Sequence, residues 1–240
     1  MEVWAELEPS SKWEKLGKRA VALLEAGANA LDIPEAPLGA PRGYAPIIAC
    51  LLHERLGART IPHIRLLDVN LNAVISIAKG LRACGVEELV VLRGDPPLYG
   101  EPVNTSSEEA ARLVRETVRG VRVGALLSLR HGREKVLGRV RGPFDFFLVT
   151  RWVNRLEDLE VAAGEAHEQG KKLVGYLIVG CGEGLERLRR LLQGQPVLGP
   201  EEAVELAGIV DGLLDAVLVS SPGDVGCLAR VISMLRDRAG

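Results

Sequence analysis

Residues 59–83 read RTIPHIRLLDVNLNAVISIAKGLRA, and this stretch contains the alternation that decides the fold. The apolar run Arg59–Leu66 predicts a β-strand, because a parallel strand that is covered on both faces reads as an almost continuous apolar run. A helix is predicted to begin soon afterwards, near Asp68 or Asn70, and either residue could be its N-cap. The stretch therefore predicts one strand followed by one helix.

The same unit recurs along the chain. Further strands are predicted at Val3–Leu7, Ala28–Ile33, Glu88–Arg93, Val121–Ser128, Phe144–Thr150, Lys172–Val179 and Ala216–Ser220. Further helices are predicted at Ser11–Ala26, Gly43–Leu56, Glu108–Arg119, Asn154–Gln169, Gly184–Leu192, Pro200–Val210 and Asp224–Arg238, and the segment before Phe144 reads as a short basic connection. Eight units in 240 residues predict an α/β protein with a (β/α)8 TIM barrel that forms a single domain over residues 1–240. An open doubly wound sheet is the alternative, but no GxGxxG turn follows the first strand.

The composition excludes several classes of protein. The chain has 30 basic and 32 acidic residues, and only 4% of its residues are aromatic, which argues against binding of single-stranded nucleic acid. No apolar run reaches the roughly 18–20 residues of a membrane span, and the acidic first residues do not resemble a signal peptide. We therefore expect a soluble cytoplasmic protein without a nucleic-acid or membrane partner. Arginine greatly outnumbers lysine and amides are few, which suggests a thermophilic source.

The four cysteines are widely spaced and form no CxxC pair. They are Cys50, Cys84, Cys181 and Cys227. Buried free thiols are the expected state, because isolated cysteines behave as small apolar residues. No cluster of histidines, cysteines and carboxylates has the spacing of metal ligands, so no metal site is predicted.

Polar residues near the ends of the predicted strands mark a candidate site, because barrel enzymes place their chemistry at the carboxyl ends of strands. Glu6 lies in the first strand, and Asp95 follows the fourth. A carboxylate that points into a barrel is costly unless it is paired or solvated, so both are candidates for a raised pKa and an acid–base role. A structural ion pair with an arginine at the barrel mouth is the alternative. At Asp95, the preceding Gly94 would let the backbone approach a ligand closely.

Three other polar residues allow two interpretations each. His63 is either a ligand contact or a hydrogen-bonded interior histidine. Asp68 either contacts a ligand or caps the helix that follows it. Asp32 either belongs to the site or is the buried partner of an arginine.

Several segments, taken together, resemble one known family. They are GANALDIP at residues 27–34, IPHI at 61–64 followed by Asp68 and Asn70, and LRGDPP at 92–97. In this order they resemble the methylenetetrahydrofolate reductase family, which comprises flavin-dependent (β/α)8 barrels of one-carbon metabolism. The segment AELEP at residues 5–9 is similar to the first strand of that family.

The resemblance implies a flavin-dependent oxidoreductase. Hydride would pass from NAD(P)H to a bound flavin, and then to the methylene carbon of a folate-type or modified pterin, which gives the methyl form. Glu6 matches the family's general acid, and Asp95 matches a residue that lies between flavin and pterin. The matched flavin contacts are His63, Asp68, Leu92, Arg93, Gly94 and Asp95. FAD is the cofactor that the family implies, with FMN or another flavin-type cofactor as alternatives.

The second half of the chain departs from the family pattern. Thr150 and Arg151 occupy the substrate-binding position where the family has Thr-Gln, and arginine cannot accept a hydrogen bond from a pterin. The connection at residues 131–139, where the family helps to hold the adenosine half of the flavin, is short. A second hypothesis is therefore a non-catalytic or partner-dependent paralogue that binds a pterin or flavin, as a homo-oligomer or with an electron-transfer subunit. A third is a (β/α)8 enzyme for an unrelated small substrate, with the glycine-rich turn at residues 180–184 as an anion site.

Overall fold

A closed barrel of parallel strands forms the centre of the molecule. The computed structural model describes residues 1–192 and 194–239, with strands β1 (Glu2–Glu6), β2 (Ala30–Ile33), β3 (Thr60–Arg65), β4 (Glu88–Leu92), β5 (Arg122–Ser128), β6 (Phe146–Thr150), β7 (Lys172–Val179), β8 (Val197–Leu198) and β9 (Ala216–Ser220). The strands from β1 to β6 pair in chain order, β9 pairs with both β1 and β7, and the pairing of β6 with β7 closes the ring. The predicted (β/α)8 barrel is confirmed.

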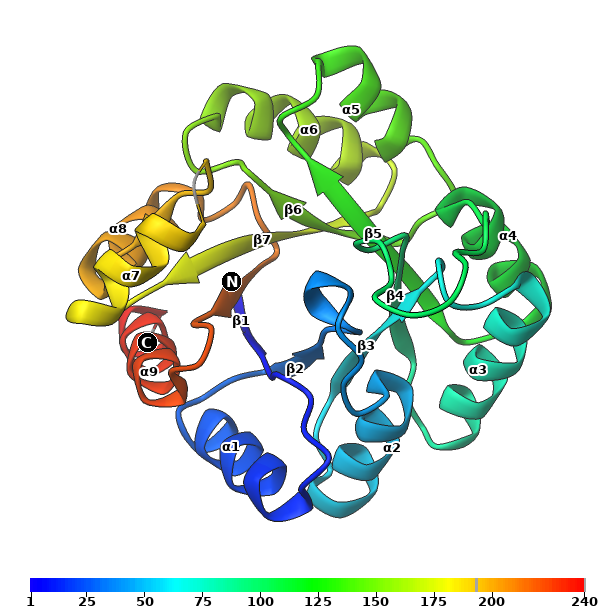
Figure 1. The fold of residues 1–240 in the computed structure, drawn as a ribbon. Coiled ribbons are helices and arrows are strands. Elements are labelled where there is room, and N and C mark those ends of the chain that lie inside the picture. The colour runs from blue at the N-terminus through cyan, green and yellow to red at the C-terminus, as the bar shows by residue number, and fades with distance from the viewer. Residues whose placement is uncertain (193, 240) are drawn as a thin grey trace.

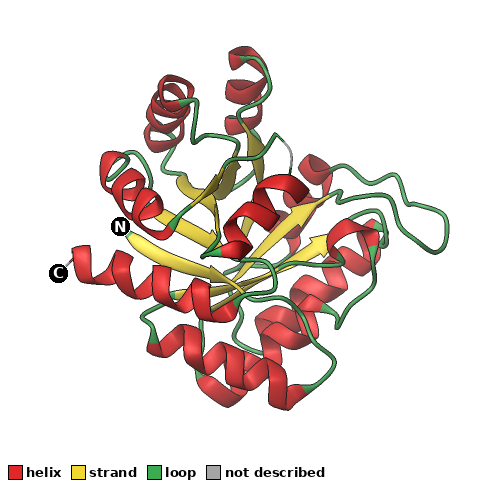
Figure 2. Cartoon of the chain, turned by 60° about the vertical axis from the view of Figure 1, so that its left-hand side comes forward, coloured by secondary structure: helices red, strands yellow, loops and turns green. Residues whose placement is uncertain are grey.

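The helices form an outer ring around these strands, as Figure 1 shows in a view along the barrel and Figure 2 from the side. They are α1 (Trp13–Glu25), α2 (Ala45–Leu56), α3 (Leu71–Ala83), α4 (Ser107–Thr117), α5 (Arg133–Val140), α6 (Leu156–Glu168), α7 (Glu183–Leu191), α8 (Pro200–Ile209) and α9 (Val225–Ala239), with a short 3-10 turn, η1 (Pro37–Gly39). No helix in the described part of the chain is long and apolar enough to cross a membrane.

Two elements differ from the sequence prediction. The segment that reads as a basic connection forms α5, an eight-residue helix whose buried positions, Val136 and Val140, lie one helical turn apart. Its other positions are mostly charged, so its apolar face is too narrow to stand out in the sequence. The second difference is β8, whose two residues pair with the end of β7.

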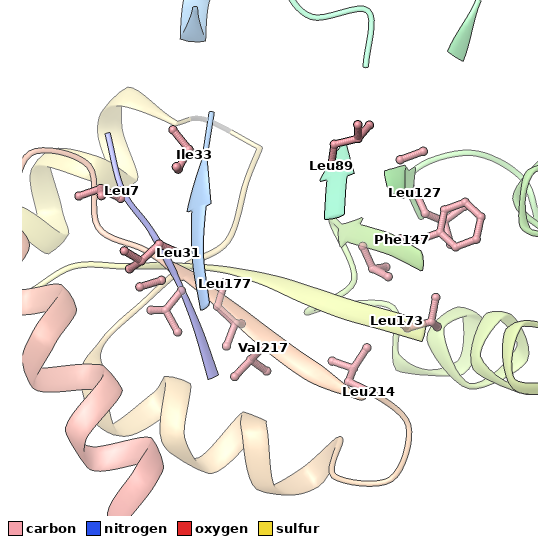
Figure 3. Close-up of a cluster of buried hydrophobic side chains, with 14 of the residues drawn as sticks. Leu7, Leu31, Ile33, Leu89, Leu127, Phe147, Leu173, Leu177, Leu214 and Val217 are labelled. Atoms are coloured by element: carbon pink, nitrogen blue, oxygen red, sulfur yellow. The ribbon is translucent and has the colours of Figure 1, made fainter. Parts of the chain in front are cut away.

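Two apolar layers hold the barrel together. One lies between the strands and the helices, and Figure 3 shows members of it, including Leu31, Leu177 and Val217. The other fills the inside of the barrel and includes Trp4 and Phe146, whose rings meet edge to face with centroids 6.0 Å apart. The interior is therefore a packed core rather than a pore, and a ligand must bind at one of its ends.

An ion-pair network lies at the amino-terminal end of the barrel. Arg59 contacts Glu88 at 2.6 Å and Glu2 at 2.8 Å, and Arg122 contacts Glu88 at 3.1 Å. The guanidinium of Arg59 also lies 5.1 Å from the ring centre of Trp4. These charges are therefore paired with one another at this end of the barrel.

The expectation of free thiols is wrong, because all four cysteines form disulfides. Cys50 in α2 pairs with Cys84, which directly follows α3, and Cys181 in the loop after β7 pairs with Cys227 in α9. The partners are separated by 34 and 46 residues in the sequence, but the fold brings their Cα atoms to 5.6 and 5.7 Å. These distances are normal for a disulfide. No local sequence motif indicates the two pairings.

Candidate functional site

Polar side chains gather at the carboxyl end of the barrel, which we call the mouth. Glu6 ends β1 and Asp32 lies in β2, and the two are register partners, so both point into the barrel from neighbouring strands. His63 in β3, Tyr176 in β7 and Ser220 in β9 join them through hydrogen bonds. Five strands thus contribute to one polar cluster, which lies above the apolar layer that contains Trp4.

Glu6 is held by two hydroxyl groups. Tyr176 donates to its Oε2 at 2.9 Å, and Ser220 donates to its Oε1 at 2.6 Å. Burial and the neighbouring charge of Asp32 raise the pKa of Glu6 above its ordinary value, although both hydrogen bonds oppose the shift. Among the described residues no arginine forms an ion pair with Glu6, so its contacts do not match the structural alternative.

Asp32 and His63 form a buried hydrogen-bonded pair. His63 Nε2 lies 2.9 Å from Asp32 Oδ1, and Asp32 is completely inaccessible to solvent. Burial lowers the pKa of His63, but the charge and the hydrogen bond of Asp32 outweigh it, so the net shift is upward. The second oxygen of Asp32 has no hydrogen-bond partner in the described structure. Asp32 is therefore the partner of a histidine rather than of an arginine.

Arg65 lies at the end of β3 and organises the rim of the mouth. It is 3% exposed and contacts Asp68 at 2.7 Å. Its carbon chain occupies the space that a Cβ atom on Gly94 would need, and Gly94 has a φ of +79°. Asn70, not Asp68, caps α3, because its Oδ1 accepts a hydrogen bond from the Ala73 amide at 3.0 Å. The interpretation of Asp68 as a helix cap is therefore wrong.

Asp95 lies on the exposed loop after β4 rather than inside the barrel. Its Oδ2 accepts a hydrogen bond from the Leu38 amide at 3.1 Å, and the Leu98 amide donates to the Gly39 carbonyl at 3.3 Å. The loops that follow β2 and β4 are therefore joined across the rim. The expected burial of this carboxylate is not found, and its part in a reaction stays a prediction.

A cavity of about 700 Å³ lies beside the mouth, between α4, α5 and the ends of β4 and β5. Its lining includes five side chains that are or can become positively charged: Arg93, Arg130, His131, Lys135 and Arg139. Leu92, Gly94 and Leu126 also line it, and among its basic residues Arg139 is paired with Glu108. This lining suits a ligand that carries phosphate groups and an apolar ring, and a flavin nucleotide has both.

The match to known families covers the amino-terminal half of the chain. Residues 11–129 match the family model for methylenetetrahydrofolate reductase. Over these residues, just under half of the chain, the sequence is similar to the methylenetetrahydrofolate reductase family. The match includes Asp32, His63, Arg93, Gly94 and Asp95. No curated protein matches the sequence.

Solved structures show the same fold. A protein from Clostridium thermocellum, described as binding two copies of 5-methyl-5,6,7,8-tetrahydrofolic acid, has a TM-score of 0.68 and 12% identity, over 99% of this chain and 95% of that one. Phosphoribosyl anthranilate isomerase from Thermus thermophilus has a TM-score of 0.57 and 17% identity, over 99% and 100%. Yersinia pestis DHPS, solved with a pterine-sulfa conjugate, has a TM-score of 0.58 and 13% identity, over 100% and 94%. At these identities the likeness shows the fold alone.

The methylenetetrahydrofolate reductase resemblance placed Thr150 and Arg151 in the substrate site. Thr150 ends β6, and Arg151 follows it with a left-handed backbone conformation, at a φ of 60°. The guanidinium of Arg151 donates to the Gly194 carbonyl at 2.5 Å. This side chain therefore supports the segment before β8, and its contact with a substrate stays a prediction.

Sequence reasoning missed two members of the mouth, Tyr176 and Arg65. Both lie within runs that read as continuous buried strands, where a single polar residue is easily overlooked. Strand alternation contains the signal: Tyr176 is two residues beyond Val174, which faces the barrel interior, and Arg65 is two residues beyond His63. A polar residue at an inward position near the carboxyl end of a strand is a candidate for the site.

Proposed function

We propose that this protein reduces the methylene group of a folate-type or modified pterin to the methyl form with the help of a bound flavin. The observation that carries the proposal is Glu6, whose carboxyl group is held at the mouth with a raised pKa. Such a group retains its proton at a higher pH than an exposed carboxyl and can deliver it to a weakly basic ring nitrogen. The methylenetetrahydrofolate reductase family match and the folate-binding neighbour support the pterin as substrate class.

The residues of the chain divide the work between acid catalysis, electrostatics and binding. Glu6 gives the proton that opens the methylene-bridged ring of the pterin. His63, held by Asp32 and favoured in its charged form, uses Nε2 for that contact and keeps Nδ1 as a further hydrogen-bond donor. We assign the cavity beside the mouth to the flavin, with Arg93, Arg130 and Lys135 on its phosphates. FAD, or FMN in its place, supplies the hydride when bound, and NAD(P)H is the proposed donor.

A second candidate function is a partner-dependent or non-catalytic paralogue that binds a pterin or flavin. Two observations favour it: Asp95 is engaged with the Leu38 amide, and Arg151 with the Gly194 carbonyl. Each of these predicted site residues thus has one hydrogen bond within the protein. The two functions differ in whether the protein alone converts a methylene-pterin.

Flavin binding and turnover separate these functions. The purified protein is mixed with FAD or FMN, and the visible spectrum is recorded after removal of the free flavin. The reduced complex then receives methylene-tetrahydrofolate, and the methyl product is quantified by chromatography. Binding with turnover supports the proposal, binding without turnover supports the second candidate, and a protein that binds neither flavin excludes the flavoenzyme.

A substitution tests the acid itself. Glu6→Gln is expected to lower the turnover about 10²–10⁴-fold, which is the range for loss of a general acid, while flavin binding persists. Glu8→Gln is the matched control, because Glu8 is partly exposed and its polar contacts in the described structure are with Arg19 and the Gly223 amide. Full turnover by Glu6→Gln would remove Glu6 from the mechanism.

A further inference from the structure

We propose that Tyr176 and Ser220 are positioning residues for Glu6, and that their two hydroxyl groups fix the orientation and the acidity of its carboxyl group. The inference rests on the proposed function, in which Glu6 is the acid. It assigns a role to two strands, β7 and β9, that lie beyond the segment matched by the family.

The barrel geometry places one donor on each carboxyl oxygen. Glu6 ends β1, and β9 lies between β1 and β7 in the sheet. Ser220 reaches Oε1 from the adjacent strand, while Tyr176 needs its longer side chain to reach Oε2 from one strand further away. Because both oxygens are engaged from the same side of the barrel, rotation of the carboxyl group would break both hydrogen bonds.

The two hydroxyl groups act most strongly after the proton has left. A hydroxyl hydrogen bond to an ionised carboxylate is stronger than one to a neutral carboxyl group. When the proton of Glu6 moves from its carboxyl oxygen to a pterin nitrogen, the O–H bond breaks and an N–H bond forms. Tyr176 and Ser220 then both donate to the carboxylate that remains. They thereby stabilise the product of the transfer and make Glu6 a stronger acid than its surroundings alone would allow.

The other groups around Glu6 act in both directions. Burial and the carboxylate of Asp32, on β2, disfavour the charged form of Glu6, while His63, on β3, favours it. The hydroxyl of Tyr176 keeps its own proton, because burial and the nearby Glu6 raise its pKa well above the ordinary value. Burial and Asp32 therefore favour the protonated form of Glu6, while the hydroxyl groups of Tyr176 and Ser220 favour loss of its proton.

A carboxyl titration tests this role without relying on turnover. The protein is labelled with ¹³C at the glutamate carboxyl carbons, and the Glu6 signal is identified by its loss in Glu6→Gln. Tyr176→Phe and Ser220→Ala are each expected to raise the pKa of Glu6 by about one unit, because each removes one hydrogen bond to the charged form. In the flavin-loaded enzyme, the alkaline limb of the pH–rate profile should move upward by the same amount.

Two controls match these variants. Ser221→Ala removes a neighbouring buried hydroxyl whose Oγ has no partner in the described structure, and Tyr99→Phe removes an exposed phenol on the loop after β4. Both should leave the Glu6 titration unchanged. The inference is overturned if Ser220→Ala and Tyr176→Phe titrate like the wild-type protein, and Ser220→Ala suffices where Tyr176→Phe does not fold.

The outcomes separate this inference from the proposed function. A shifted Glu6 titration in a protein without pterin reduction would uphold the role of the hydroxyl groups and reject the reductase. Turnover that depends on Glu6 with an unshifted titration would do the opposite.

Discussion

The Asp32–His63 pair shows how one buried charge sets the state of another. Asp32 has one oxygen on His63 and no hydrogen-bond partner for the other in the described structure. A buried carboxylate with so few partners is costly to ionise unless a cation lies beside it, so the charged imidazole compensates for the charge of Asp32. The pair therefore favours the charged form of His63 at the mouth.

This pairing predicts a pH-dependent stability. The folded-state pKa of His63 lies above its ordinary value, so the stability that it contributes is fully present below about pH 6.5 and is lost as the pH rises through the folded-state pKa. Asp32→Asn should lower the free energy of unfolding by about 1–3 kcal/mol at pH 5.5 and by less at pH 9. Guanidinium unfolding measures both values, and NMR of the His63 ring should show a lower pKa in the variant.

The control for this prediction is an exposed aspartate. Asp211→Asn removes a carboxylate that is 3.9 Å from the amino terminus and 67% exposed, so its effect should stay below about 0.5 kcal/mol. An equal effect of Asp32→Asn at both pH values would show that the charge of His63 does not stabilise the fold.

At the level of elements, α5 divides its charged residues between two surfaces. Lys135 and Arg139 line the cavity beside the mouth, while Arg133 lies 3.5 Å from Asp158 of α6. Val136 and Val140 anchor the helix in the core. One short helix thus separates cavity-lining cations from a cation that pairs with the next helix.

This division predicts which cations of α5 bind a flavin nucleotide. Lys135→Ala should weaken FAD binding about tenfold, because it removes one charge-assisted contact to phosphate, and the loss should shrink at high salt. Arg133→Ala, on the same helix, should bind FAD like the wild-type protein. Fluorescence titration with FAD measures both affinities, and equal affinities of the two variants would place the phosphates elsewhere.

The elements differ in how far the sequence could predict them. The barrel strands were predictable because their apolar runs are long, and the Glu6 and His63 positions because charge is unusual there. The sequence did not indicate α5, because most of its positions are charged and its apolar face is narrow. Strand β8 has only two residues, which is too short to show an apolar pattern. Tyr176, Ser220 and Glu6 meet only because strands distant in sequence close the barrel, with Tyr176 and Glu6 170 residues apart. That proximity depends on topology and has no local signature.

At the level of the whole molecule, two disulfides join elements that are neighbours only in the fold. One joins α2 to the end of α3, and the other joins the β7–α7 loop to α9. Disulfides persist in oxidising compartments and in intracellular proteins of hyperthermophiles. Their main effect on stability is to restrict the unfolded chain.

Each disulfide is expected to contribute about 2–4 kcal/mol to the free energy of unfolding, because each closes a loop of tens of residues. The double variants Cys50→Ala/Cys84→Ala and Cys181→Ala/Cys227→Ala should both show this loss in guanidinium unfolding. Mass spectrometry after alkylation provides the check on the bonds themselves. Four modified cysteines in protein that was unfolded without reductant would contradict the pairing.

The ion pairs around Arg59 bear on the direction from which ligands reach the site. Together with the packed apolar layer inside the barrel, they separate the amino-terminal end of the barrel from Glu6 at the mouth. A molecule that reaches Glu6 through the mouth enters and leaves past the same rim. Two reactants that both need the position beside Glu6 must therefore bind one after the other. The loops after β2 and β4, which Asp95 joins, lie at this rim and border the route by which reactants enter and products leave.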